Sequence, residues 1–184
     1  MDTSVVLRPL AAYLLMAPGL WSTATSAAVP PIAYQYAAQA AEIPPEVLYA
    51  IALQESGLEL RGRRRPWPWT LNVAGKSQYY SSRTQACAAL QYAARRVKAT
   101  RIDVGLAQLN LGYQRAHYSA PCELLSPAHN LTIAASILRR HRRAGEDWLP
   151  AIGRYHRPAG GPLATRYQRR VSEYLSRLQK GTLQ

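Results

Sequence analysis

Along most of this 184-residue chain, apolar residues recur at the spacing of three and four positions that is typical of amphipathic helices. The stretch 67–80 differs, because it contains Pro68, two tryptophans and the turn-forming pair Ala74-Gly75, and we expect a hairpin or an irregular flap there. A second non-helical stretch, 101–110, is expected to be a turn. The sequence therefore predicts a mostly α-helical single domain, of α+β character only through one small β-hairpin flap. The expected helices cover 32–41, 45–56, 82–98, 126–143, 148–155 and 165–178.

Residues with known positional preferences mark the boundaries of these helices. Pro45 suits a first helical turn and Gly57 suits a helix end, so one helix should run between them. Ser82 with Gln85 forms a capping-box pattern at the start of a later helix. Thr165 is expected to cap the last helix.

The beginning of the chain has the pattern of a secretory signal. An apolar run at 10–17 is followed by small residues over 22–28, as in signals that are cleaved on export. We expect residues 1–28 to be a signal peptide and 29–184 to be the exported domain, in the periplasm or secreted. A retained membrane anchor and an ordinary first helix are the alternatives. The apolar run is short for a bilayer and no later segment is longer, so no transmembrane span is expected.

The formal net charge of +13 predicts attraction to polyanions, since 23 lysines and arginines face only 10 acidic residues. Nucleic acid, acidic envelope polymers and membrane surfaces are all candidate partners, and ordinary solvated helix faces are an equal alternative. A nucleic-acid-binding module is disfavoured by the export signal and by the lack of a helix-turn-helix or zinc pattern. The basic residues form small clusters at 61–65, 95–98, 139–143 and 169–170.

The two cysteines, Cys87 and Cys122, suit an exported protein with one disulfide. Two free buried thiols are the alternative. A zinc site is not expected, because two isolated cysteines lack the ligand spacing of such sites. We expect no metal and no other cofactor.

Glu55 is the residue that points most directly to chemistry. It continues the apolar stripe of Leu48 and Ile51, seven and four positions earlier, and therefore lies on the inward face of its helix near the helix end. Burial disfavours the charged form of a carboxyl group and raises its pKa. A raised pKa is what a general acid needs in order to protonate a glycosidic oxygen near neutral pH. The alternative is a structural ion pair with one of the many arginines.

Five short segments then match one family in its own order. Gln54-Glu55-Ser56-Gly57 resembles the Glu-Ser-Gly signature of the lytic transglycosylase catalytic domain, in the lysozyme-like superfamily, and 105–110 resembles its Gly-Leu-Met-Gln-Ile-Asn motif. The resemblance extends over 44–178 and implies a lysozyme-like fold. The other three matching segments are Asn130-Leu131, 151–156 and Tyr167 with Val171.

The resemblance also implies a reaction. Most glycosidases use two carboxylates, whereas this family uses one glutamate, here Glu55, to cleave the β-1,4 bond between N-acetylmuramic acid and N-acetylglucosamine. The N-acetyl group assists and the 6-hydroxyl of the sugar attacks, which leaves a 1,6-anhydro end without net hydrolysis. Asp103 is the nearest candidate for a second acid, although an aspartate that stabilises a loop is the better reading of its position.

Six further residues are implied to bind the glycan. Ser56 would orient Glu55 or the N-acetyl group, and Gln108 would touch the sugar. Tyr155 and Tyr167 would lie beside Glu55, with core packing as the alternative for both. The implied substrate-binding set is Ser56, Gln108, Asn110, Tyr155, His156 and Tyr167.

Some of these positions depart from the family pattern or have a plainer explanation. Ala107 replaces the usual methionine and Ala134 a common glycine, which should only change packing. His156 replaces a common asparagine that lines the cleft in relatives. Asn110 could simply stabilise a turn, and Asn130 is expected to be structural.

The Trp67-Pro68-Trp69 segment could stack on sugar rings or form a local hydrophobic cluster. It resembles an insert found in members that serve conjugation and other envelope-spanning machines, which implies local opening of the wall. A lysozyme-type hydrolase and a non-catalytic peptidoglycan-binding assembly protein are the competing functions.

Overall fold

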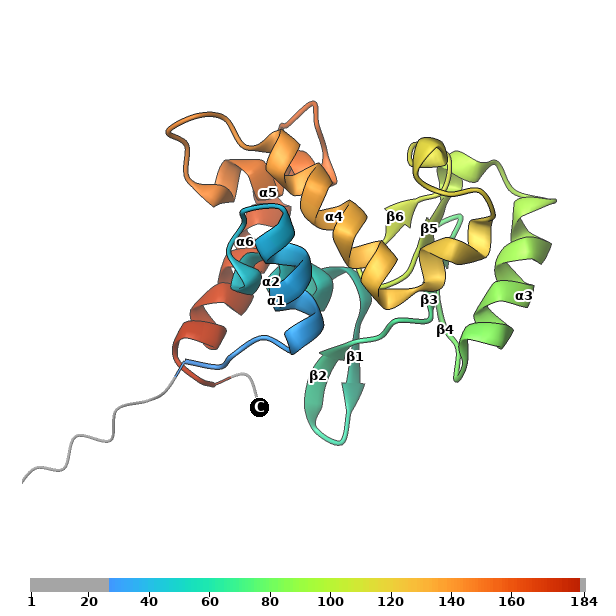
Figure 1. Ribbon diagram of the computed structural model, residues 1–184, viewed down its shortest axis with the longest axis horizontal. Coiled ribbons are helices and arrows are strands. Elements are labelled where there is room, and N and C mark those ends of the chain that lie inside the picture. The colour runs from blue at the N-terminus through green and yellow to red at the C-terminus, as the bar shows by residue number, and fades with distance from the viewer. Residues whose placement is uncertain (1–26, 183–184) are drawn as a thin grey trace, which may run out of the picture.

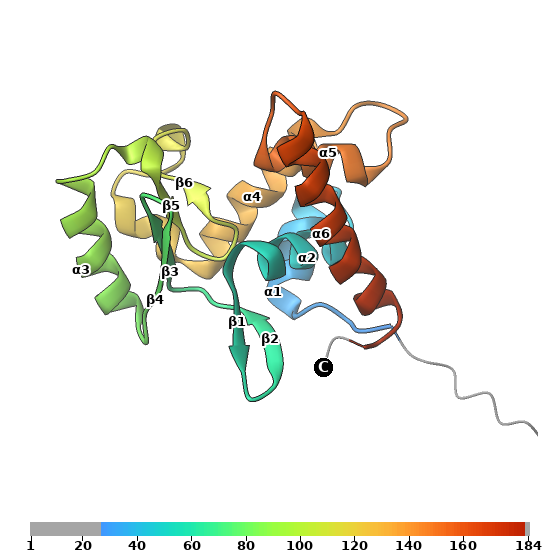
Figure 2. The same cartoon turned by 180° about the vertical axis from the view of Figure 1, so that it is seen from behind.

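The computed structural model describes residues 27–182 (Figure 1). Five helices gather on one side of the molecule, and a small sheet with the remaining helix, α3, lies on the other side. The helix α4 extends from the helical group toward the sheet, and Figure 2 shows the same division from behind. The helices of the described part are α1 (Ile32–Ala40), α2 (Pro45–Ser56), α3 (Arg83–Ala94), α4 (Pro127–His141), α5 (Trp148–His156) and α6 (Pro162–Gln179).

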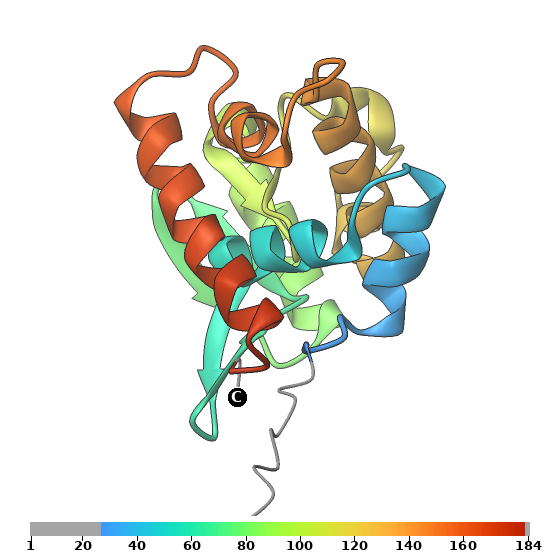
Figure 3. The ribbon, with the colours of Figure 1, turned by 90° about the vertical axis from the view of Figure 1, so that its left-hand side faces the viewer.

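The helix α2 lies in the middle of the helical group and contacts α1, α4 and α6 (Figure 3). It is apolar around most of its circumference, so that Leu48, Ala50, Ile51, Ala52 and Leu53 are all fully buried. Such a helix is stable only when other elements cover it on several sides. Its last turn, which carries Glu55, is therefore held by packing from several elements at once.

Two antiparallel sheets follow from the central part of the chain. β1 (Gly57–Leu60) and β2 (Arg63–Pro66) form a separate hairpin directly after α2. The larger sheet has the order β4-β3-β5-β6. Its strands are β3 (Thr70–Val73), β4 (Lys76–Tyr79), β5 (Ile102–Val104) and β6 (Leu109–Asn110).

One face of the larger sheet belongs to the core. Leu71 of β3 pairs with Val104 of β5, which in turn pairs with Leu109 of β6, and all three side chains are buried. α3 contacts β3, and it places Ala86 and Leu90 in the same core. Because side chains alternate between the faces of a sheet, the opposite face carries the polar residues of these strands.

The predicted fold class is confirmed, and so are several boundaries. The helix 45–56 has the expected limits, and the expected hairpin within 67–80 is formed by β3 and β4. The β1–β2 hairpin was not expected, since Arg63, Arg64 and Arg65 show none of the apolar alternation of a half-buried strand. The segment 101–110 is more than a turn, because it contributes β5 and β6.

Two helix ends were predicted wrongly. α3 ends at Ala94 rather than at residue 98, because the N–H groups of Arg96 and Val97 both donate to the carbonyl of Ala93 and close the last turn. α6 begins at Pro162 rather than at Thr165, with Gly161 before it at a φ of 85°. Proline is favourable at a first helical position, where its missing N–H is not needed, and this moves the start of α6 forward by one turn.

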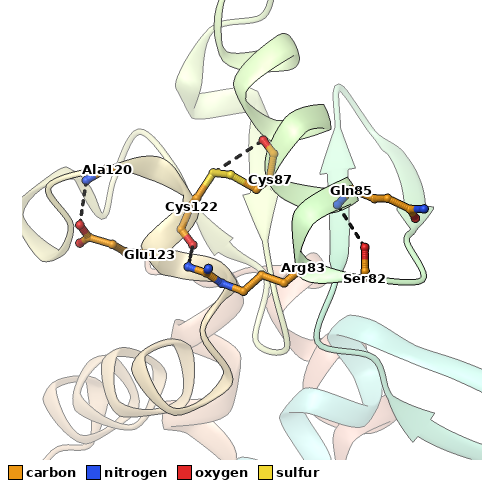
Figure 4. Close-up of a disulfide and its surroundings, with 7 residues drawn as sticks. All are labelled: Ser82, Arg83, Gln85, Cys87, Ala120, Cys122 and Glu123. Carbon is orange, nitrogen blue, oxygen red and sulfur yellow. Dashed lines mark hydrogen bonds between the residues drawn. A yellow bond between two sulfur atoms is a disulfide. The ribbon is translucent and has the colours of Figure 1, made fainter.

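The predicted disulfide is confirmed: Cys87 of α3 is bonded to Cys122 in the short 3-10 helix Pro121–Leu125 (Figure 4). Arg83 supports the same junction, since its guanidinium donates to the carbonyl of Cys122 at 3.0 Å. At the start of α3 the Ser82 hydroxyl accepts from the N–H of Gln85 at 3.2 Å, as the capping pattern predicted.

The expected signal peptide, 1–28, lies outside the described residues apart from its last two positions. Across 27–182, none of the helices combines the length and the hydropathy required to cross a bilayer.

Candidate functional site

Glu55 and Tyr167 form the centre of the candidate site. Glu55 lies in the last turn of α2, and the hydroxyl of Tyr167, from the buried face of α6, donates to Glu55 Oε1 at 2.5 Å. The two residues are 112 positions apart in sequence, so only the packing of α6 on α2 brings them together. Tyr167 is buried, whereas Glu55 remains partly exposed and can meet a ligand.

The surroundings of Glu55 raise the pKa of its carboxyl to about 7. Burial is the main cause, the hydrogen bond from Tyr167 opposes it, and the negative charge of Asp103 adds to it. The positive charge of Arg170 acts in the lowering direction. Near neutral pH such a group exists in both protonation states, so it can both donate and accept a proton.

Tyr155 of α5 is the second tyrosine of the site. Its hydroxyl donates to the carbonyl of Ala107 at 2.8 Å, and so links α5 to the loop before β6. Burial, followed by the negative charges of Glu55 and Asp103, raises the pKa of Tyr155 well above its ordinary value. Tyr155 therefore stays protonated next to two carboxyl groups.

His156 stacks flat on Tyr167, with 4.4 Å between the ring centroids and 1° between the ring planes. The histidine is exposed on its other side. Burial against Tyr167, together with the positive charges of Arg170 and Arg157, lowers the pKa of His156. A neutral imidazole at this position covers the ring whose hydroxyl holds Glu55.

Gln108 lies in the loop between β5 and β6, with a φ of 47°. Its amide nitrogen donates to the carbonyl of Gly105 at 2.8 Å and approaches that of Thr70 at 3.3 Å. The side chain is partly exposed, and its amide oxygen accepts no hydrogen bond from the described residues. That oxygen is free to accept a hydrogen bond from a ligand.

Ser56 is fully buried, and its hydroxyl lies 2.7 Å from the carbonyl oxygen of Leu106 and 3.1 Å from that of Ala52. It therefore joins the end of α2 to the loop that carries Gln108, instead of facing a ligand. A role in holding Glu55 at a set distance from this loop fits this geometry better than direct binding of sugar.

Asn130 holds the same loop from α4. Its amide nitrogen donates to the carbonyls of Val104 and Leu124, and its oxygen accepts from the N–H of Ala107, all at 2.9 Å. The loop passes so close that a Cβ on Gly105 would lie 2.4 Å from the Asn130 amide nitrogen. The asparagine is structural, as its position suggested.

Asn110 is occupied in a similar way. Its oxygen accepts from the N–H groups of Gly112 and Tyr113, and its nitrogen donates to the carbonyl of Thr100 at 3.0 Å and to Asp103 Oδ1 at 2.8 Å. The turn-stabilising alternative accounts for these bonds, and the bond to Asp103 adds a second role.

Arg170 was predicted only as part of the basic cluster 169–170 and not as a residue of the site, yet its charge acts on Glu55, on His156 and on Tyr167. It follows Tyr167 by three positions on α6, a spacing that places two side chains on one helix face and could have revealed it. Between residues 27 and 182, no group of three or more histidine, cysteine, aspartate or glutamate side chains is placed to hold a metal ion.

A family model described as Transglycosylase SLT domain matches residues 32–174 of the chain. No curated protein and no solved structure matches the chain. The family match includes Glu55, the 105–110 loop and Tyr167, and it indicates lytic transglycosylase activity on peptidoglycan. With its helical group and small antiparallel sheet, the chain belongs to the transglycosylase SLT domain family of the lysozyme-like superfamily.

Proposed function

We propose that this protein cleaves the β-1,4 bond between N-acetylmuramic acid and N-acetylglucosamine in peptidoglycan without net hydrolysis, with Glu55 as acid and base. The observation that supports this most strongly is the position of Glu55 at the end of α2, partly exposed and held by Tyr167, with a pKa raised to about 7. A lone carboxyl group with these properties suits a reaction in which one residue first gives and then takes a proton.

The proposed reaction has two steps, and Glu55 gives a proton in the first and takes one back in the second. Glu55 donates its proton to the glycosidic oxygen, the bond from that oxygen to C1 of N-acetylmuramic acid breaks, and the oxygen of the N-acetyl group bonds to C1. The 6-hydroxyl of the same sugar then attacks C1, the bond to the N-acetyl oxygen breaks, and Glu55 takes the hydroxyl proton. The product is a 1,6-anhydro end, and Glu55 is again protonated.

Three neighbours have distinct roles in this proposal. Tyr167 orients Glu55 and stabilises its carboxylate form through the 2.5 Å hydrogen bond. Tyr155 keeps the Ala107 end of the loop against α5. Gln108 offers its free amide oxygen to a sugar hydroxyl or N–H group.

Location and biological role are further parts of the proposal. The signal-like pattern over 1–28 supports export to the periplasm or beyond. The resemblance of the 67–80 hairpin to an insert of machine-associated members supports local opening of the wall for a conjugation or secretion apparatus.

Digestion of purified peptidoglycan by the wild type and by Glu55→Gln, with mass spectrometry of the fragments, tests this function. The wild type should release anhydro-muropeptides, and Glu55→Gln should lower the rate by about a hundredfold or more, because Gln cannot donate a proton. Since Gln is nearly isosteric with Glu, the variant should fold normally, as circular dichroism can verify.

Glu59→Gln is a matched control, because it changes an exposed acid four positions later, on β1. It should keep the wild-type rate. Hydrated reducing ends from the wild type would instead identify a hydrolase, and intact glycan after long incubation would favour a non-catalytic binding protein.

A further inference from the structure

A row of polar residues crosses all four strands of the larger sheet. Ser77 of β4 is opposite Asn72 of β3, Asn72 is opposite Asp103 of β5, and Asp103 is opposite Asn110 of β6. Directly opposed residues of antiparallel strands project from the same face. The row is therefore on the face opposite to Leu71, whose own side belongs to the core.

This polar face looks toward the helical group. α3 contacts β3 on the core side, and Figures 1 and 2 agree in showing α3 on one side of the sheet and α2, α5 and α6 on the other. Asp103 is the only acid of the row and is partly buried, between the buried residues Ile102 and Val104 along its strand. A carboxyl group in such a position needs a partner or a function.

Asn110 is the partner that the structure provides. Its amide donates to Asp103 Oδ1 at 2.8 Å, and its own orientation is set by the Thr100 carbonyl and by the N–H groups of Gly112 and Tyr113. Among the described residues no arginine, lysine or histidine nitrogen lies within 4.0 Å of Asp103. Asp103 is thus oriented but not neutralised.

Asp103 also shares its surroundings with Glu55. Its negative charge acts on Glu55 and on Tyr155, in both cases disfavouring loss of a proton. Burial raises the pKa of Asp103 itself, but the amide of Asn110 favours its charged form. The site therefore combines two acidic side chains: Glu55 from α2, whose carboxyl accepts from the Tyr167 hydroxyl, and Asp103 from β5, whose carboxyl accepts from the Asn110 amide.

We propose that Asp103 is a second functional carboxylate of this site, which faces the reacting sugar from the sheet and stabilises the positive charge that develops at C1, while Asn110 is its positioning residue. This inference rests on the proposed function. Asp103 forms no bond and transfers no proton: the N-acetyl oxygen bonds to C1 as the glycosidic bond breaks, and the 6-hydroxyl then displaces that oxygen and gives its proton to Glu55. A fixed negative charge close to a developing cation lowers the energy of the transition state.

The test compares the wild type with Asp103→Asn in kcat, in the pH dependence of kcat/KM and in thermal stability. Asn keeps the shape and can still meet the Asn110 side chain, so we expect a folded variant with kcat lowered by on the order of ten- to a hundredfold. Glu55 is surrounded by Asp103 from β5, Tyr155 from α5, and Tyr167 and Arg170 from α6. The substitution removes only the charge of Asp103, which raises the pKa of Glu55. The pKa of Glu55 should therefore fall, and the alkaline limb of the pH profile of kcat/KM should move to lower pH.

Ser77→Ala is the matched control, since it changes an exposed member of the same polar row on β4 and should alter neither kcat nor the pH profile. If Asp103→Asn does not fold, Asp103→Ser removes the same charge and still offers an oxygen to Asn110. The inference would be overturned if the Asp103 variant kept the kcat of the wild type and the alkaline limb of its kcat/KM profile did not move. It would also be overturned if the variant only had a lower melting temperature while that limb did not move. A wild type that releases no anhydro ends would overturn the proposed function instead.

Discussion

Tyr167 acts on Glu55 in two opposing ways. Its buried ring helps to remove the carboxyl group from water, which disfavours the charged form, while its hydroxyl donates to Oε1 and favours that form. Burial is the larger effect, so the pKa of Glu55 ends near 7 instead of below 4.5. The Tyr167 hydroxyl therefore lowers the pKa of Glu55 through its hydrogen bond. Its own pKa is raised well above the ordinary value, so it does not lose a proton near neutral pH.

Tyr167→Phe separates these two effects, because it keeps the ring and removes the hydroxyl. Without the hydrogen bond the carboxylate loses stabilisation, so the pKa of Glu55 should rise above about 7 and the alkaline limb of kcat/KM should move to higher pH. The folding cost should be small, about 1 kcal/mol. Tyr155→Phe is the comparison, since it removes a bond to the Ala107 carbonyl and none to Glu55. A limb that moves to lower pH would contradict the assigned role.

At the scale of elements, the junction of α2 and β1 determines where Glu55 lies. Gly57 ends α2 with an extended backbone, φ −60° and ψ 122°, and not with the left-handed conformation that makes glycine common at helix ends. Glycine is needed here for space: a Cβ would lie 2.2 Å from the Leu53 carbonyl oxygen and 2.4 Å from Arg64 Nε. Arg64 Nε donates to that carbonyl at 3.2 Å, and so fastens β2 to the last turn of α2.

Gly57→Ala should therefore move the hairpin away from α2 and displace Glu55. We expect a loss of about 1–3 kcal/mol in the free energy of unfolding, typical of forcing atoms into a packed region, together with a lower kcat. Urea denaturation and peptidoglycan digestion measure the two effects. Gly62→Ala, in the turn of the β1–β2 hairpin, is the control, because its Cβ would meet no atom within 4 Å. Only the backbone strain at its φ of 73° should lower the free energy of unfolding, and kcat should be unchanged. Equal losses of kcat in both variants would refute the spatial argument.

At the scale of the whole molecule, the helical group and the sheet are stabilised by different means. The helical group packs around α2, whereas the sheet has short strands, with α3 packed against β3. The Cys87–Cys122 disulfide lies on the sheet side, where it joins α3 to the segment before α4. The covalent link thus adds a connection on the sheet side, at a distance in sequence from Glu55 and Tyr167.

Removal of the disulfide by Cys87→Ser with Cys122→Ser should cost about 4 kcal/mol of unfolding free energy, the loop-entropy value for a closed loop of 35 residues. Because Glu55 and Tyr167 are held by the helical group, the folded variant should keep most of its kcat at low temperature. Urea denaturation of the variant, and of the wild type with and without reductant, gives the loss directly. An unchanged midpoint would show that the link does not support the fold.

Much of this architecture could be predicted from local patterns. The boundaries of α2 follow from Pro45 and Gly57, which have known preferences for helix ends. The buried stripe of α4 and the position of Glu55 follow from residues three or four positions apart, so all of these are visible in the sequence itself. The Cys87–Cys122 disulfide was predicted on other grounds, because an exported chain with two cysteines suits a single disulfide, with two free thiols as the alternative that the structure excludes.

Other features were decided only by the tertiary structure. β1, β2, β5 and β6 have two to four residues each, too few for a period to show, and they are strands because partners elsewhere in the chain complete their hydrogen bonds. The contact of Tyr167 with Glu55 and the orientation of Asp103 by Asn110 are likewise products of packing. Helical periodicity is a property of neighbouring residues, whereas strand pairing and the pKa of a buried acid depend on residues that are distant in sequence and close in space.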